Sequence, residues 1–177
     1  MAIQFVVETG TGLSTATSYI SLADAKQEWD NLGYDYSALS DDQLSVLLNS
    51  ATKTIDGQYF NKFKGCRSSS DQALQWPRAD AYYPDGYYIG STTIPKELER
   101  ATSEMAYADN AGTTIQPVNS SAGNVVKESS RVDVISESKE YAEGSFRSHP
   151  RIPAVDDALR PLLGSTGGYG ARPVVRV

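Results

Sequence analysis

The sequence predicts a mainly α-helical protein, with a small helical-bundle core, a long irregular loop, a β-hairpin and extended N- and C-terminal arms. Three segments combine helix-start signals with apolar residues at helical spacing. Stretches rich in Gly, Ser and Thr separate or flank these segments. An apolar content of 40% and a mean hydropathy of −0.40 indicate a modest core. The 177 residues are enough for one ordinary domain.

Two helices are expected in the first third of the chain, each after a serine that can serve as an N-cap. The first begins after Ser21 and ends near Gly33. The second begins after Ser40, where Gln43 completes a capping box, and ends near Gly57. The apolar stripes are Leu22, Ala25 and Trp29 in the first helix and Leu44, Leu47, Leu48, Ala51 and Ile55 in the second.

Further elements follow a long irregular region over residues 58–93. A third helix is expected after Pro95, where a missing N–H costs nothing, and it ends near Gly112. Its stripe is Ile94, Leu98, Ala101, Met105 and Ala108. Local alternation around Val132 and Val134 predicts a β-hairpin or two strands, and a short helix is expected after Pro153.

These patterns divide the chain into four segments. Residues 1–20 form an N-terminal arm and residues 21–112 form the helical core. Residues 113–163 hold a linker, the hairpin and the short helix, and residues 164–177 form a flexible tail.

The stretch "LQWPRAD" lies in the middle of the long irregular region. Pro77 fixes its own φ and pushes Trp76 toward extended geometry, so the segment is neither a helix nor a central strand. We expect Trp76 with Pro77 to fix the loop against the helices as part of the core. Arg78 is then free for an ion pair or an interface. A loop of this length in a compact domain is typical of a functional segment.

Aromatic and basic residues alternate in this region, and three interpretations stay open. Tyr59, Phe60 and Phe63 interleave with Lys62, Lys64 and Arg67, and four tyrosines follow, namely Tyr82, Tyr83, Tyr87 and Tyr88. Rings between cations can hold single-stranded nucleic acid. Alternatively, the phenylalanines pack on the helices and the lysines are solvated, which the net charge favours. The third interpretation is a contact between subunits, where Tyr, Trp and Arg are enriched. The turn that joins the tyrosines is expected at Pro84-Asp85-Gly86.

The formal charge of −6 argues against a protein that coats nucleic acid through bulk electrostatics. The charge is uneven along the chain. Residues 144–177 carry five arginines against two aspartates, a net charge of +3, which leaves −9 for residues 1–143. The arginines of this basic segment are Arg147, Arg151, Arg160, Arg172 and Arg176.

Catalytic and cofactor chemistry has little support, so we expect no enzymatic activity, no metal and no cofactor. The one histidine, His149, sits in a basic, loop-like stretch, and no serine has a nucleophile-elbow context. The acidic pairs Asp41-Asp42 and Asp156-Asp157 stand at helix starts, where capping is their expected role. Two glycine-rich stretches, "TGTGL" and "GSTGGYG", lack the Lys-Ser/Thr of a phosphate loop, which leaves an enzyme that uses one of them as the weakest alternative.

Compartment signals are consistent with a protein that assembles in a cytoplasm. Cys66 is the single cysteine, so an intrachain disulfide and a thiolate cluster are excluded. No apolar run approaches the roughly 20 residues of a membrane helix. The stretch "MAIQFVVETGTG" has no basic region leading into a long apolar run, so it does not read as a signal peptide.

The order of motifs over about residues 8–165 resembles a family of small phage proteins labelled DnaT-like and single-stranded-DNA-binding. It is also similar to the head–tail connector (adaptor or head-completion) proteins of tailed bacteriophages. The stretches that carry the resemblance are "TGTGLSTATSYISLADAKQEW", "ATKTIDGQY", "QALQWPR", "IPKELERATSEMAYA" and "PAVDDALRPLL", and "QALQWPR" is the most specific of them.

The connector resemblance implies a helical adaptor core that forms a dodecameric ring beneath the portal, at the head–tail junction of the virion. Its implied partners are further copies of itself, the portal protein and a downstream tail or neck protein. Double-stranded DNA would pass through the lumen without specific binding, and an acidic lumen would let the phosphates slide. The alternative function is that of a single-stranded-DNA-binding replication accessory protein.

Overall fold

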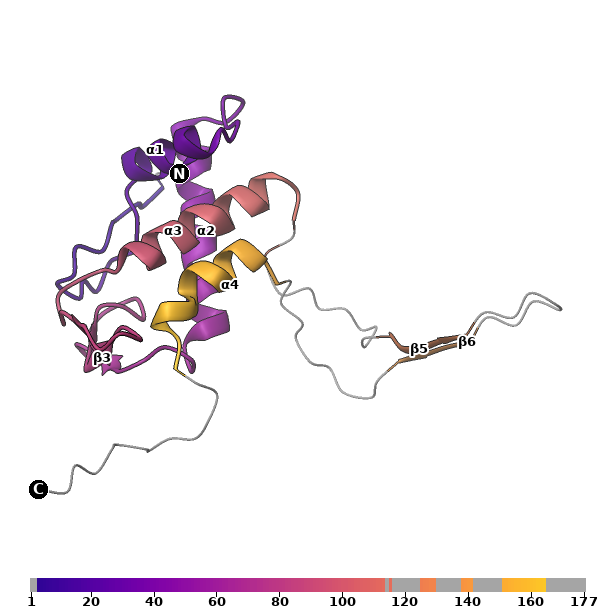
Figure 1. Cartoon of the computed structure of the whole chain (residues 1–177). Coiled ribbons are helices and arrows are strands. Elements are labelled where there is room, and N and C mark those ends of the chain that lie inside the picture. The colour runs from indigo at the N-terminus through magenta and orange to yellow at the C-terminus, as the bar shows by residue number, and fades with distance from the viewer. Residues whose placement is uncertain (1–2, 114, 116–124, 130–137, 142–150, 165–177) are drawn as a thin grey trace, which may run out of the picture. The chain divides into compact units, whose positions relative to one another are not determined.

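The computed structural model describes residues 3–113, 115, 125–129, 138–141 and 151–164 (Figure 1). The chain divides into two compact units, which are described separately. Met1–Thr113 and Arg151–Val177 form the first unit, and Thr114–Pro150 forms the second.

Four helices build the core of the first unit. They are α1 (Leu22–Leu32), α2 (Asp41–Tyr59), α3 (Lys96–Asn110) and α4 (Pro153–Leu159), the last extended by a 3-10 turn over Arg160–Leu162. The helix α3 crosses α2, and α4 lies alongside α3 (Figure 1). The buried apolar side chains include Leu44, Leu48, Ala51, Ile55, Leu98, Ala101, Met105, Val155, Leu159 and Leu162. The apolar stripes of the sequence therefore face a common core, which confirms the prediction of a small helical core.

The helix starts follow the predicted capping residues. The side chain of Ser21 accepts a hydrogen bond from the backbone N–H of Asp24, and Ser40 with Gln43 forms a complete capping box. The predicted end of α2 at Gly57 is wrong, because the helix continues to Tyr59. Tyr59 is buried, and its hydroxyl donates to Asp156 Oδ1 at 2.5 Å. This packing against α4 outweighs the low helix propensity of one glycine, about 1 kcal/mol.

The described part of the predicted N-terminal arm, residues 3–20, lies on the core instead. Ala16, Tyr19 and Ile20 are buried, and Val7 and Ser18 form an isolated parallel bridge. The segment "ATSYI" has too few apolar residues in a periodic pattern to show this burial from sequence. The prediction of an extended arm was wrong for these residues, because the buried side chains of Tyr19 and Ile20 fix this otherwise polar segment on the core.

The short helix α4 also belongs to the first unit. The sequence grouped it with the hairpin in residues 113–163, whereas the structure packs α4 against α3. Val155, Leu159 and Leu162 are all fully buried. Burial of these three side chains explains why α4 belongs to the first unit, because the apolar face of a short helix needs a partner surface.

The long region between α2 and α3 holds two very short antiparallel strand pairs. In the first pair β1 (Cys66–Arg67) lies opposite β2 (Arg78–Ala79). In the second pair β3 (Ala81–Tyr82) lies opposite β4 (Tyr88–Ile89). The sequence predicted an irregular region here, and it did not predict these strands.

The second unit contains an antiparallel hairpin of β5 (Val125–Ser129) and β6 (Ser138–Tyr141), which confirms the predicted hairpin. The register shifts between Val125 and Lys127. The alternation around Val132 and Val134, on which the prediction rested, lies outside the described residues. None of the helices in the described part of the chain is long and apolar enough to cross a lipid bilayer.

Candidate protein-interaction surface

Residues 81–89, here called the tyrosine hairpin, present aromatic rings to solvent. Ala81 pairs with Ile89 and Tyr82 pairs with Tyr88 in the antiparallel register. Because side chains alternate along a strand, Ala81 and Ile89 are buried while Tyr82 and Tyr88 are 49% and 53% exposed. The two exposed rings lie with their centroids 5.4 Å apart. The hairpin therefore holds two neighbouring aromatic rings on its outer face.

The turn of the tyrosine hairpin lies at Pro84-Asp85-Gly86, as predicted. The N–H of Tyr83 donates to the carbonyl of Tyr87 at 2.8 Å, and the N–H of Gly86 donates to the carbonyl of Tyr83 at 3.0 Å. Gly86 has a φ of 89°, which favours glycine at this position. The turn leaves Tyr87 72% exposed, so a third ring extends the aromatic surface.

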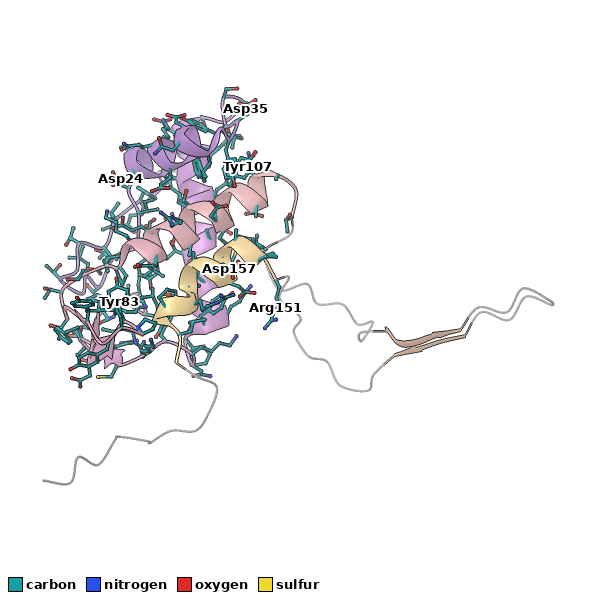
Figure 2. The ribbon with its side chains drawn as sticks, viewed as in Figure 1. Asp24, Asp35, Tyr83, Tyr107, Arg151 and Asp157 are labelled. Carbon is teal, nitrogen blue, oxygen red and sulfur yellow. The ribbon has the colours of Figure 1, made fainter. Side chains whose placement is uncertain are left out.

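Tyr83 fixes the hairpin to the helical core. Its hydroxyl donates to Glu97 Oε2 in the first turn of α3 at 3.0 Å. Burial, together with this carboxylate, raises the pKa of Tyr83 to about 12. In Figure 2 Tyr83 lies at the hairpin end of the first unit. Of the four tyrosines proposed from sequence, three are therefore exposed and Tyr83 is an anchor.

The hairpin follows directly on a buried tryptophan. Trp76 is fully buried, and its ring meets Phe63 edge-on with centroids 6.0 Å apart. The backbone N–H groups of Gln75 and Trp76 both donate to the hydroxyl of Tyr19, at 2.9 and 3.2 Å. The core role predicted for Trp76 is confirmed, and the peptide bond between Trp76 and Pro77 is cis.

A buried carboxylate supports the same segment. Asp56 on α2 accepts from the hydroxyl of Tyr19 at 2.5 Å and from the N–H of Gln75 at 3.0 Å. Burial raises the pKa of Asp56 to about 6, although these hydrogen bonds and the positive charge of Arg78 act in the opposite direction. Tyr19 in turn has a pKa raised well above its ordinary value, first by burial and then by Asp56.

Arg78 is buried, so the prediction that it is free for an ion pair or an interface was wrong. Its guanidinium donates to three backbone carbonyls, those of Lys64 at 2.7 Å, Gly65 at 2.8 Å and Gln75 at 3.3 Å. These carbonyls belong to irregular backbone that has no strand partner to satisfy it, and five guanidinium N–H donors suit that task. Arg78 therefore links the backbone at Lys64 and Gly65 to the backbone at Gln75.

Gln72 completes this arrangement. Its side-chain amide donates to the carbonyls of Leu74 and Pro77 at 2.8 and 3.1 Å, and its oxygen accepts from the N–H of Ser69 at 2.8 Å. The stretch "QALQWPR" thus holds the long loop against α2, and the tyrosine hairpin emerges from it. The stretch that carries the most specific part of the family resemblance is therefore the structural support of the tyrosine hairpin, here called the scaffold.

The alternating basic and aromatic residues before this stretch are largely engaged within the chain. Tyr59 and Phe63 are buried, whereas Phe60 is 50% exposed. Lys62 lies over the ring of Tyr59, and Lys64 donates to the carbonyl of Pro161 at 2.8 Å. The guanidinium of Arg67 donates to the carbonyl of Ser70 at 2.6 Å. The interpretation favoured from sequence, in which Phe60 and Phe63 pack on the helices, is confirmed for Phe63 and wrong for Phe60.

The stretch that contains the tyrosine hairpin carries no cation of its own. Residues 79–91 contain two aspartates and no Lys or Arg, and residues 22–42 contain six acidic residues against Lys26. Of these acids, Asp24 lies by α1, and Asp35 lies farther from Tyr83, at the opposite end of the first unit (Figure 2). Within residues 79–91 a phosphate group would meet carboxylates and no cation, so this stretch favours an uncharged or basic partner.

The glycine-rich stretch "TGTGL" surrounds a carboxylate of the chain itself. Glu8 is buried, and its carboxylate accepts from the N–H groups of Gly10, Gly12 and Leu13 at 2.8–2.9 Å. Such a nest of N–H groups is a common anion site, and here the anion is the side chain of Glu8. Phosphate binding by this stretch would require that Glu8 be expelled.

The remaining candidate residues are exposed or lie outside the described part of the chain. Arg160 donates to Asp157 Oδ1 at 2.6 Å, and Arg151 lies 3.9 Å from Asp156 Oδ2 near the start of α4 (Figure 2). Arg147, His149, Arg172 and Arg176 lie outside the described residues. Within the described residues, no group of three or more His, Cys, Asp or Glu side chains is placed to hold a metal ion.

Comparison with known proteins gives one family. Residues 3–177 match the family described as "Putative DnaT-like ssDNA binding protein". The chain belongs to this family. No curated protein and no solved structure matches the chain. The match agrees with the DnaT-like part of the resemblance drawn from sequence, and it lends no support to the head–tail connector part.

Proposed function

We propose that this DnaT-like family member is a structural protein, a head–tail adaptor of tailed bacteriophages. In this proposal copies of the chain form a ring between the portal and the tail and complete the DNA conduit. The chain acts through its surfaces, without enzymatic activity and without a cofactor. Its partners are further copies of itself, the portal protein, a downstream tail or neck protein and the DNA that passes through the lumen.

The observation that carries the proposal is the ordered, cation-free tyrosine hairpin. Three tyrosines are exposed on a scaffold that is fixed by Trp76, Arg78 and the bond from Tyr83 to Glu97. Rigid tyrosines bring large contact areas at low entropic cost, and Tyr is enriched in the centres of protein interfaces. A stretch with two aspartates and no cation is better suited to protein contact than to a phosphate backbone.

The overall charge supports the same proposal. Residues 1–143 carry a net charge of −9, and a wall lined with carboxylates repels phosphates and lets DNA slide. In a closed ring each subunit offers two different patches to its neighbours, so one exposed patch per subunit is expected to meet an unlike surface. A lumen lined mainly by Lys and Arg would contradict this part of the proposal.

The test compares the double variant Tyr82→Ser/Tyr88→Ser with Phe60→Ser in a complementation assay for infectious particles. Phe60 is a matched control, since it is 50% exposed and lies outside the hairpin. Loss of two interface tyrosines at about 1–2 kcal/mol each should reduce incorporation into particles by tenfold or more. Both variants should keep the melting temperature of the parent chain. Equal incorporation of the two variants would refute the role of the hairpin.

A second candidate function is binding of single-stranded DNA, which the family description favours. The pair of exposed rings at Tyr82 and Tyr88 offers the stacking surface that such binding needs. This function predicts that the intact chain binds a labelled oligothymidylate with an affinity that falls steeply with salt, and that Tyr82→Ser/Tyr88→Ser abolishes the binding. The adaptor proposal predicts no binding of consequence at physiological salt.

A further inference from the structure

The large exposed apolar and aromatic side chains of the first unit fall mainly in two places. Seven such side chains are exposed in the described part of the chain, and five of them lie either in the tyrosine hairpin or in a groove at the start of α2. The hairpin contributes Tyr82, Tyr87 and Tyr88, and the groove contributes Ile3 and Val46. Exposed apolar residues that cluster mark interaction sites, whereas single ones do not. The two patches are therefore candidates for contact with other molecules.

The groove is mostly apolar, with a carboxylate beside the apolar side chains. It has a volume of about 450 Å³ and lies between the start of α2, the end of α3 and the N-terminal segment. Its apolar lining is Ile3, Leu39, Val46 and Leu47, and Asp42 in the first turn of α2 is one of its polar lining residues. Clefts of this volume hold small organic groups, so the groove has room for a phenol ring. The sequence did not predict the groove, because Val46 falls outside the apolar stripe of α2.

A tyrosine side chain has the chemistry that this groove accepts, since it combines an apolar ring with a hydroxyl donor. The described chain pairs tyrosine with carboxylates repeatedly, and five of its tyrosine hydroxyls donate to Asp or Glu. These bonds join Tyr19 to Asp56, Tyr34 to Glu104, Tyr36 to Asp30, Tyr59 to Asp156 and Tyr83 to Glu97. The three exposed tyrosines of the hairpin make no such bond within the described residues, so their hydroxyls can donate to a carboxylate of another molecule.

The tyrosine hairpin cannot fill the groove of its own chain. The groove lies at the start of α2, whereas the scaffold of the hairpin is bonded near the end of this helix, through Asp56 and Gln75. The 19 residues of α2 span about 28 Å at 1.5 Å per residue. In Figure 2 Asp35, in the loop that leads into α2, lies at the opposite end of the first unit from Tyr83. Both patches belong to one compact unit, so only the hairpin of a second copy can enter the groove.

We propose that the tyrosine hairpin of one copy docks in the groove of the next copy, with the ring of Tyr87 on Val46 and Ile3 and a tyrosine hydroxyl donating to Asp42. This inference rests on the proposed function, because it takes the hairpin as a protein contact and names its partner. The two patches differ and lie at opposite ends of the first unit, so the contact is heterologous. Such a contact repeats from copy to copy, as a ring requires.

The charges of the two patches predict how the contact responds to salt. Residues 79–91 carry Asp80 and Asp85, the groove is lined by Asp42, and neither patch contains a Lys or Arg. The attraction therefore comes from apolar burial and neutral hydroxyl donors, and salt screens the remaining repulsion. Association of the copies should be as strong or stronger at high salt, whereas binding of single-stranded DNA to the same rings would weaken steeply.

Cross-linking between two separately labelled full-length chains tests the proposal. Both chains carry Cys66→Ser, which removes the single, exposed cysteine. One chain then carries Val46→Cys in the groove, and the other carries Tyr87→Cys, which keeps the rings of Tyr82 and Tyr88. The matched control replaces Val46→Cys by Phe60→Cys, since Val46 and Phe60 are 49% and 50% exposed and Phe60 lies at the other end of α2. Oxidation of the mixture should give the mixed disulfide dimer at least tenfold faster with the groove cysteine than with the control.

Three results would overturn the proposal. Equal rates at Val46 and Phe60 would mean that the hairpin does not select the groove. A disulfide between two Tyr87→Cys chains that forms as fast as the mixed one would assign the hairpin to a two-fold contact with itself. No cross-linking at either position would exclude docking. If the chain nevertheless forms a ring in particles, only the docking contact is wrong, so this failure is distinct from failure of the adaptor function.

Mixing of two blocked chains supplies a second readout that needs no introduced cysteine. Val46→Asp blocks the groove of one full-length chain and Tyr87→Asp blocks the hairpin of the other, and each should weaken self-association, measured by sedimentation velocity, at least tenfold. An equimolar mixture keeps one intact hairpin and one intact groove, so it should form a dimer that grows no further. Both variants should keep the melting temperature of the parent chain, because both side chains are about half exposed or more. A mixture that associates no better than each variant alone, or a parent chain that stays monomeric at its highest soluble concentration, would contradict the docking.

Discussion

Replacement of Trp76 by alanine is expected to destabilise the first unit severely. The indole is fully buried, it packs edge-on against Phe63, and the backbone at this position is bonded to the hydroxyl of Tyr19. Truncation of a buried Trp costs about 3–5 kcal/mol. At 2–4 °C per kcal/mol for a protein of this size, the melting temperature should fall by about 6–20 °C.

Thermal unfolding followed by far-ultraviolet circular dichroism measures this effect without relying on tryptophan fluorescence. Tyr87→Ala is the control, because Tyr87 is 72% exposed and its loss should change stability by less than about 0.5 kcal/mol. Trp76→Phe should cost less than Trp76→Ala, since it keeps a ring and removes the indole Nε1, which is buried without a hydrogen-bond partner. An unchanged melting temperature in Trp76→Ala would refute the scaffold role and assign the ring to a contact surface.

Three further predictions concern residues that hold the loops of the first unit in place. Gly10→Ala should destabilise the chain by more than about 2 kcal/mol in urea unfolding, because the new Cβ would lie 1.9 Å from the carbonyl oxygen of Thr92 and the φ of Gly10 is 95°. A variant as stable as the parent chain would show that this loop rearranges freely. Asp56→Asn should remove a pH dependence of the free energy of unfolding. Burial raises the folded pKa of Asp56 from 3.8 to about 6, so the stability that protonated Asp56 contributes is present below pH 4 and is lost as pH rises through 6, by about 1–3 kcal/mol. Parallel curves of stability against pH for the two chains would contradict this. Arg78→Lys should cost about 2–4 kcal/mol in the same assay, since one ammonium cannot serve three separate carbonyls, and a loss below 0.5 kcal/mol would show that these bonds contribute little.

The helices were predictable because their determinants are local. Ser40 with Gln43 specifies the start of α2, and the stripe from Leu44 to Ile55 specifies the buried face. Trp76 was predictable as a core residue, because burial of its large apolar ring is what can hold an irregular, proline-containing segment against the helices. The end of α2 was missed, because it depends on the contact between Tyr59 and Asp156, which are 97 positions apart.

The environment of the long loop could not be read from sequence for the same reason. Arg78 is a charged residue in a loop, which ordinarily indicates solvent, and its burial depends on carbonyls that lie 13 and 14 positions earlier. Glu8 likewise gives no local sign that its carboxylate fills the glycine-rich stretch. The tyrosines were identified as candidates by composition, but the exposure of Tyr82 and Tyr88 and the anchoring of Tyr83 follow from the strand register.

Cryo-electron microscopy of purified phage particles, with the chain present or deleted, tests the central claim most directly. The account predicts a ring of density between the portal and the tail into which the helical unit fits, with the tyrosine hairpin against protein, and filled heads without tails when the chain is deleted. Particles that lack the chain and retain their tails, together with tight oligothymidylate binding by the isolated protein, would contradict it and establish the single-stranded-DNA-binding function in its place.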